Sequence, residues 1–244
     1  MELNLKTKKP MHMKTLILVI SMFFSITVPA QTNKIDAITG ATMQDDSAGK
    51  EANIWNVIQN RRSVREFKPD SIPDKDILRI IDAARMAPTS GNQQPWKFLI
   101  IKDKNKINQM KEACIKRALD RFDNNNNNKE TKEQFTERIN KQLSSGYFSA
   151  PVFIIVLTDN HSMYPDYNHW DGPLAGGYLM LAARALGYGT VFITDAISES
   201  ITKEVLQIPD SYTRVCITPL GIPVEWPATP KKKKLEEFIV REKF

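Results

Sequence analysis

The chain has 244 residues, of which 41% are hydrophobic and 25% are charged, and its formal net charge is +6. This length and composition fit one globular domain with a sizeable core and some additional sequence, and they exclude a wholly disordered or fibrous protein. Without the first thirty residues, which hold four lysines and one glutamate, the charge falls to about +3, so no nucleic-acid partner is predicted.

Residues 1–30 have the pattern of a secretory signal peptide. Lysines precede an apolar run over residues 15–28, and Val28 and Ala30 place small residues just before Gln31. An uncleaved membrane anchor is the alternative, but the run is shorter than the ~20 residues that a spanning helix needs. We therefore expect cleavage after Ala30 and export to the periplasm.

The folded domain is expected over residues 51–244, because residues 31–50 are polar and aperiodic and predict a flexible linker. Hydrophobic periodicity and the proline and glycine breakers predict the elements of this domain. Helices are expected near residues 54–58, 73–87, 107–122, 130–143, 174–186 and 199–206. Strands are expected at residues 96–101, 152–157, 190–193 and 214–221, and loops at residues 89–95, 124–128 and 159–171.

The predicted helices and strands interleave without a strict β-α-β repeat. The expected fold class is therefore α+β, with a central, mainly antiparallel sheet flanked by helices. Cys114 and Cys216 are the only cysteines, and two cysteines do not make a disulfide framework. We expect both to be small buried apolar residues rather than a bridge.

Two short segments carry most of the chemical information. Residues 61–65 bring together Arg61, Arg62, Ser63 and Arg65, and arginine suits a phosphate because its planar fork donates two parallel hydrogen bonds. Residues 88–96 gather hydroxyl, amide and glycine groups on a turn, where they can hydrogen-bond the polar edge of a ring. Together the segments predict a site for a large, flat, phosphorylated ligand.

With these motifs in this order, residues 54–238 resemble the nitroreductase family of FMN enzymes. The resemblance implies a homodimer with the flavin at its interface, where both chains contribute groups. It assigns Arg61, Arg62 and Ser63 to the ribityl chain and phosphate. It assigns to the flavin ring, from the partner chain, Pro88, Thr89, Ser90 and Asn92.

The same resemblance places the turn of Gly187, Gly189 and Thr190 near the isoalloxazine. Gly187 can instead be only a helix C-cap, and Arg65 can be only a surface residue. After residues 219–225, relatives place a basic residue on the flavin phosphate, and Lys232 stands where arginine is expected. A point charge there loses the bidentate grip of a guanidinium. Which of residues 231–234 contacts the phosphate is left open, and a solvated tail is the alternative.

The sequence has no Ser-His-Asp set, metal-ligand cluster or P-loop, so no metal and no catalytic side chain are assigned. The resemblance implies an oxidoreductase in which hydride passes through flavin N5 to a small electron-poor acceptor, such as a nitroaromatic or a quinone. NAD(P)H or an extracytoplasmic donor would supply the electrons. The alternative is a non-enzymatic electron-transfer flavoprotein with covalently tethered FMN, and a flavin-binding module without turnover is a third.

A second resemblance lies in the linker. Residues 36–42, Asp-Ala-Ile-Thr-Gly-Ala-Thr, resemble the recognition sequence of exported flavin-transfer enzymes, in which the last threonine is esterified to the phosphate of FMN. The resemblance implies covalent FMN on Thr42 and a flavin transferase as a partner. A linked FMN can fill the protein's own site or act as a second, mobile carrier, and an unmodified linker is the alternative.

Overall fold

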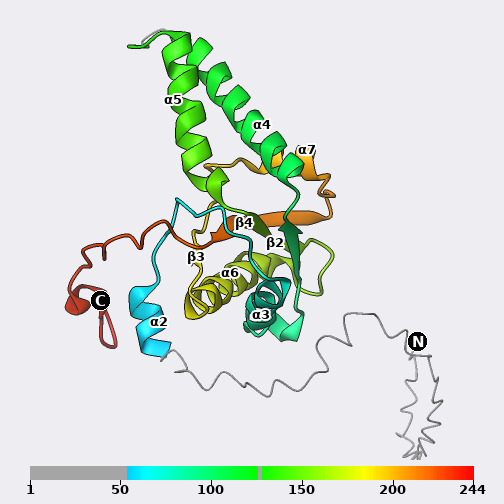
Figure 1. The fold of residues 1–244 in the computed structure, drawn as a ribbon. Helices are drawn as coiled ribbons and strands as arrows, with labels where there is room; N and C mark the ends of the chain where they lie inside the picture. Colours follow the sequence, from blue (N-terminus) through cyan, green and yellow to red (C-terminus); the bar gives the residue numbers. More distant parts are fainter. Residues whose placement is uncertain (1–53, 126–127) are drawn as a thin grey trace, which may run out of the picture. The chain divides into compact units, whose positions relative to one another are not determined.

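The computed structural model describes residues 54–125 and 128–244 (Figure 1). The predicted signal peptide, the linker and Thr42 lie outside these residues. Within the described part of the chain, no helix is long and apolar enough to cross a membrane.

A four-stranded sheet forms the centre of the fold. Its strands are β1 (Trp96–Ile101), β2 (Val152–Asp159), β3 (Gly189–Thr190) and β4 (Tyr212–Gly221). They lie in the order β1-β2-β4-β3, and every neighbouring pair is antiparallel. The prediction of a mainly antiparallel sheet is therefore confirmed.

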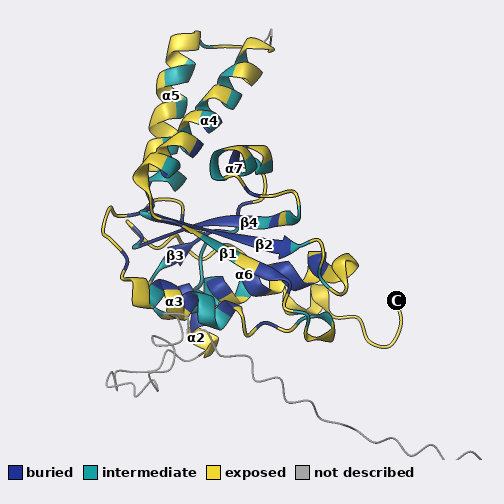
Figure 2. Ribbon diagram, turned by 90° about the vertical axis from the view of Figure 1, so that its right-hand side faces the viewer, coloured by how far each residue is buried: buried dark blue, intermediate teal, exposed yellow. Residues whose placement is uncertain are grey.

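Helices cover both faces of the sheet (Figures 1 and 2). One face carries α3 (Asp74–Ala84) and α6 (Asn168–Ala185), and α2 (Ile54–Asn60) contacts α6. The other face carries α4 (Lys104–Asp123), α5 (Lys132–Ser145) and α7 (Glu199–Leu206). The last short element is a 3-10 turn, η4 (Leu235–Phe238), near the C-terminus.

Strand β2 shows why the sheet needs cover on both sides. Ile154 and Val156 pack into the core cluster with α3 and α6, whereas Phe153 and Ile155 pack into the cluster with α4 and α7. Both sets are fully buried, so the strand reads as a continuous apolar run instead of alternating. Each such side chain contributes about 1.5–3 kcal/mol of burial free energy.

Helix α4 starts earlier than the hydrophobic pattern predicts. The Asp103 side chain caps it by accepting a hydrogen bond from the Asn105 backbone at 2.8 Å. A capping box of Thr131 and Gln134 starts α5. Together α4 and α5 form a hairpin that extends beyond the sheet and is largely exposed at its far end (Figures 1 and 2).

Two sequence-based bounds are wrong. The helix expected at residues 174–186 begins at Asn168, directly after a 3-10 turn, η3 (Pro165–Tyr167), so residues 159–171 are only partly a loop. Gly172 and Pro173 disguised this start. Glycine and proline have low helix propensity, so the sequence pattern did not indicate a helix here. The strand expected at residues 190–193 is reduced to β3, although Ile193 still pairs with Ile217 as an isolated bridge.

Both cysteines are buried and free, as predicted. Burial raises the pKa of the Cys114 thiol to about 11 and that of Cys216 to about 12. Neither thiol is a reactive thiolate at neutral pH, because burial disfavours the charged form.

Candidate functional site

The first predicted segment leaves α2 and runs beside β3. Ser63 and Thr190 form a parallel bridge, and the Val64 backbone N–H donates to the Thr190 carbonyl at 3.0 Å. The approach requires glycine at position 189, because a Cβ there would lie 2.7 Å from Val64 Cγ2. The structure therefore brings the predicted arginine segment and the predicted Gly189–Thr190 turn together.

Within this segment, two groups stay available for a ligand. The Arg61 guanidinium and the Ser63 hydroxyl are half-buried, and neither has a hydrogen-bond partner in residues 54–125 and 128–244. Arg62 is engaged: its Nη1 donates to the carbonyls of Gln59 at 2.7 Å and Arg61 at 2.9 Å, and its Nη2 donates to Thr229 Oγ1. Arg62 therefore connects the arginine segment to the C-terminal segment through Thr229.

Arg65 and Lys232 are less well placed than Arg61 and Ser63 to contact a ligand within one chain. Arg65 is exposed, and its guanidinium donates to the Ser63 carbonyl at 3.2 Å. Lys232 is exposed, and its ammonium makes no ion pair or hydrogen bond with any other described residue. Within one chain, the C-terminal group that meets the arginine segment is Thr229.

Arg184, in the last turn of α6, is a cation that the sequence reasoning missed. Its guanidinium lies over the Trp226 ring, 3.7 Å from the centroid. Burial lowers its pKa, and the positive charge of Arg62 lowers it further. Neither arginine has a carboxylate as an ion-pair partner among the described residues. The only sequence signal was a basic residue at a predicted helix C-terminus.

Beside Arg184 lies a hollow of about 240 Å³, which Gly187 helps to line. Gly187 has a φ of 85°, and its backbone N–H donates to the Arg184 carbonyl at 3.0 Å. Leu186 is the C-cap of α6, and Gly187 is the left-handed residue directly after it that ends the helix. Because Gly187 also lines the hollow, a ligand in the hollow would contact it.

The second predicted segment forms a tight turn ahead of β1. Ser90–Asn92 is a 3-10 turn, and Gly91, Asn92 and Gln94 have φ values of 56°, 54° and 48°. Left-handed backbone is costly for residues other than glycine, so other contacts must hold the turn. Thr89 Oγ1 accepts from the Gln94 backbone at 3.2 Å, whereas Pro88 is exposed.

The residue that holds this turn is Asp171, in the first turn of α6. The residue is 3% exposed, so its carboxylate is buried. Oδ1 accepts from the Ser90 backbone N–H at 3.1 Å and faces the Ser90 hydroxyl at 3.4 Å, while Oδ2 accepts from Gln93 Nε2 at 2.7 Å. Asp171 has no ion-pair partner in the described ranges. The expectation of a loop over residues 159–171 concealed this role.

The two predicted segments lie at opposite ends of α6. Ser90 contacts Asp171 at the start of this helix, and Gly187 directly follows its end. At about 1.5 Å of rise per residue, the sixteen positions between them correspond to roughly 24 Å along the axis. A single chain therefore does not bring both segments onto one short ligand.

Large apolar side chains are exposed on surfaces near both segments. The exposed set lies on α2, on α6 and in the C-terminal segment, and it comprises Ile54, Trp55, Ile58, Trp170, Leu174, Tyr178, Leu235, Phe238, Ile239 and Val240. Contiguous exposed apolar surface marks protein interfaces. A partner chain would cover such a surface.

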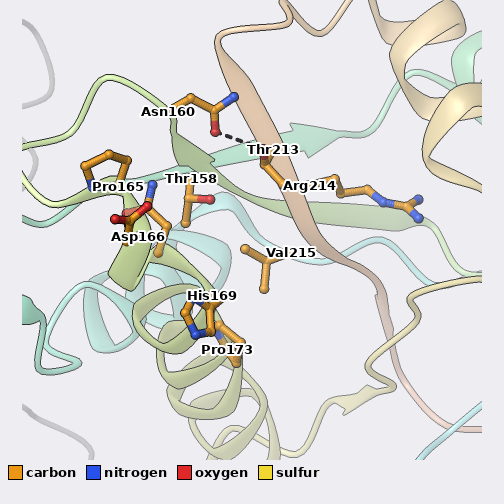
Figure 3. A pocket seen from close by; sticks show the side chains of 10 residues that line it. Thr158, Asn160, Pro165, Asp166, His169, Pro173, Thr213, Arg214 and Val215 are labelled. Atoms are coloured by element: carbon orange, nitrogen blue, oxygen red, sulfur yellow. Dashed lines mark hydrogen bonds between the residues drawn. The ribbon is translucent and has the colours of Figure 1, made fainter.

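A separate hollow of about 620 Å³ lies between the ends of β2 and β4 and the start of α6 (Figure 3). Asn160 and Thr213 close one side through a hydrogen bond of 2.8 Å between their side chains. His169 contributes from α6, but no group of three metal-ligating side chains occurs in the described part of the chain. The Arg214 side chain extends away from the other labelled residues.

A model of the nitroreductase family matches residues 58–222 of this chain. A protein of Archaeoglobus fulgidus, provisionally named NADH dehydrogenase/NAD(P)H nitroreductase, is 32% identical over 173 residues, which is 68% of this chain and 83% of that protein. Iodotyrosine deiodinase of Thermotoga neapolitana is 29% identical over 189 residues, covering 77% of this chain and 96% of the enzyme.

Solved structures give the same result for the fold. A crystal structure of oxidised iodotyrosine deiodinase bound to FMN and 3-iodo-L-tyrosine has a TM-score of 0.62 and 26% identity, over 79% of this chain and all of that one (100%). A BluB-like flavoprotein of Clostridium difficile 630 has a TM-score of 0.61 and 25% identity, over 78% of this chain and 99% of its own.

Proposed function

Because this chain belongs to the nitroreductase family, we propose that it is an FMN-dependent oxidoreductase that reduces a small electron-poor acceptor. The observation that carries the proposal is a half-buried guanidinium and hydroxyl, Arg61 and Ser63, that lack protein partners in the described ranges and lie beside Thr190. A structurally related enzyme of 26% identity holds FMN.

The residues present fit a flavin phosphate. Arg61 and Ser63 supply donors, and Arg62 and Arg184 add positive charge that no ion pair among the described residues neutralises. A dianionic phosphate gains two charge-assisted hydrogen bonds from one guanidinium. FMN, when bound, supplies the redox chemistry by accepting hydride at N5 and passing it on. The protein's own residues bind it, orient it and shape the acceptor site.

The site is shared between two copies of the chain in this proposal. The arginine segment of one protomer and the Ser90–Asn92 turn of its partner meet at one flavin, which removes the separation of roughly 24 Å along α6. The exposed apolar side chains of α2 and α6, such as Trp55 and Leu174, supply surface for such an interface. A closed two-fold dimer then holds two equivalent sites.

A subunit-mixing experiment tests the sharing. Arg61→Ala and Asp171→Ala chains with different tags are co-expressed, and the mixed dimer is isolated by two affinity steps. We expect each variant homodimer to hold little FMN and the mixed dimer to hold about half the wild-type amount, because one of its two sites then receives both intact segments. A mixed dimer as poor in FMN as the homodimers would contradict a shared site.

The acceptor is proposed to be a nitroaromatic or a quinone. A second candidate is a halogenated aromatic, since relatives with 29% and 26% identity are iodotyrosine deiodinases. The test is steady-state reduction of a nitroaromatic, a quinone and 3-iodo-L-tyrosine by the FMN-loaded protein, with NADH and with dithionite as donors. Turnover with none of them would contradict the enzymatic proposal and favour an electron-transfer role.

We also propose export to the periplasm and a covalent FMN on Thr42, on the grounds of the sequence alone. The tether would retain the cofactor outside the cytoplasm, where free FMN is easily lost. The test is the intact mass of the mature protein after co-expression with a flavin transferase. We expect a gain equal to FMN less water that disappears in Thr42→Ala, and an unchanged mass would contradict the modification.

A further inference from the structure

A hollow of about 490 Å³ lies between α4, the segment that follows β3, the start of α7 and β4. Three arginines line it: Arg117 and Arg121 from α4, and Arg214 from β4. Arg117 and Arg121 are four positions apart, so they share one face of the helix and repel each other. Three positive charges therefore converge on one cavity, away from the arginine segment at residues 61–65.

Arg214 is a buried cation held by neutral groups. It is 9% exposed, and its Nη1 donates to the Ile197 carbonyl at 2.7 Å, while its Nη2 donates to the Thr194 carbonyl. Burial lowers its pKa, and the carboxylates of Glu199 and Asp195 oppose this effect only in part. It makes no salt bridge within the described part of the chain. A buried charge without an ionic partner is costly, and an anion in the hollow would offset that cost.

Two carboxylates also line the hollow, and of these only Glu199 has a cationic side chain, Lys203, as its ion-pair partner among the described residues. Asp195 Oδ2 accepts from the Thr194 hydroxyl at 3.0 Å. Glu199 Oε1 lies 3.8 Å from Lys203 Nζ and accepts from the Arg214 backbone N–H at 3.4 Å. The side chains of Arg117 and Arg121, by contrast, have no hydrogen-bond or ion-pair partner among the described residues. Three guanidiniums therefore face one carboxylate, Asp195, that no cation neutralises, and the hollow keeps an excess of positive charge.

The hollow neighbours the proposed flavin half of the same chain. Thr194 is four residues beyond Thr190, which pairs with Ser63, and Ile193 is still bridged to β4. Extended chain rises about 3.3 Å per residue, so the hollow begins within about 13 Å of Thr190. The edge of the hollow at Thr194 is therefore near the backbone that pairs with Ser63, so a small molecule in the hollow can extend toward the ligand that Arg61 and Ser63 would hold.

We propose that this arginine-lined hollow binds the anionic group, a carboxylate or a phosphate, of the small molecule that the protein reduces. This inference rests on the proposed function. Guanidinium forks pair with carboxylate and phosphate oxygens through two parallel hydrogen bonds, which fix orientation as well as affinity. The hollow then selects acidic acceptors over neutral ones of the same shape, because only the acidic ones neutralise Arg117 and Arg121.

Matched ligands test the selection by calorimetric titration of the FMN-loaded protein. 4-Nitrobenzoate and 4-nitrobenzyl alcohol differ in charge but carry the same nitroaromatic ring, and 4-nitrophenyl phosphate separates phosphate from carboxylate. We expect at least one of the two anions to bind about tenfold more tightly than the alcohol, with an advantage that shrinks at high salt. The double substitution of the half-buried Arg117 and the exposed Arg121, Arg117→Gln with Arg121→Gln, should remove the advantage, and the milder Arg121→Lys should reduce it. The matched control is Arg79→Gln, an exposed arginine on α3.

The outcomes separate the two proposals. Equal affinity for the alcohol and both anions, or an anion preference that persists in the Arg117→Gln and Arg121→Gln protein, would overturn the anion site. If that preference depends on Arg117 and Arg121 but no acceptor is reduced, the proposed function fails and a binding site for small anions remains. A lower KM for the preferred anion than for the alcohol, abolished by the same variants, supports both.

Discussion

The two halves of the proposed flavin site are built in different ways. The arginine half runs along the sheet edge, where backbone hydrogen bonds such as Val64 N–H to the Thr190 carbonyl hold it. The ring half is a turn with left-handed backbone at Gly91 and Asn92, and one buried carboxylate, Asp171, ties it to α6. The first half keeps free donors on backbone that is hydrogen-bonded to β3, whereas the second depends on side-chain contacts, of which Asp171 supplies the buried ones.

The two halves should therefore respond differently to substitution. In the arginine half, the ligand groups and the supporting groups are different atoms, so a ligand group can be removed without loss of the fold. In the turn, support comes from a residue that touches no ligand in this proposal, and the strained conformation relaxes when that support is lost. Variants of the arginine half should lose FMN affinity alone, whereas variants of the turn should lose both affinity and stability.

The largest effect is expected from Arg61→Ala. Removing the free guanidinium deletes the charge-assisted hydrogen bonds to the phosphate, which corresponds to a rise in the Kd for FMN of about 10- to 100-fold. The free energy of unfolding without FMN should stay nearly unchanged, since the Arg61 side chain makes no hydrogen bond or ion pair with other described groups. Flavin fluorescence titration and urea unfolding measure the two quantities. An unchanged Kd beside an unchanged Arg79→Ala control would show that the phosphate lies elsewhere.

A smaller effect, about tenfold in the Kd for FMN, is expected from Asp171→Ala. Here the stability should fall too, because the N–H groups of Ser90 and Gln93 lose a buried acceptor. Asp171→Asn should recover part of the affinity, since the amide oxygen still accepts from Ser90 whereas its NH₂ opposes Gln93. A shift in the absorbance spectrum of bound FMN would report the altered turn. Equal losses in the alanine and asparagine variants would contradict this positioning role.

The same difference explains how much the sequence predicted. The arginine half could be predicted because its ligand groups are adjacent in the chain, and the helix–strand order followed from apolar periodicity. Asp171 could not, because its partner Ser90 is far away in sequence and glycine and proline hide the helix start. Arg184 was missed since nothing local shows that it lies over Trp226. The arginine hollow likewise depends on tertiary contact between α4 and β4.

The smallest effect is expected from Tyr188→Phe, which alters the support of the arginine half without removing a ligand group. Tyr188 Oη donates to Asp76 Oδ2 at 2.6 Å, so the loss should cost about 1 kcal/mol of unfolding free energy at pH 7. Burial and this hydrogen bond raise the Tyr188 pKa from 10.0 to about 12. Its stabilising contribution is thus complete below pH 10 and is lost as the pH rises through 12. Urea unfolding of both proteins at pH 7 and at high pH measures this, and a constant difference would contradict the assignment.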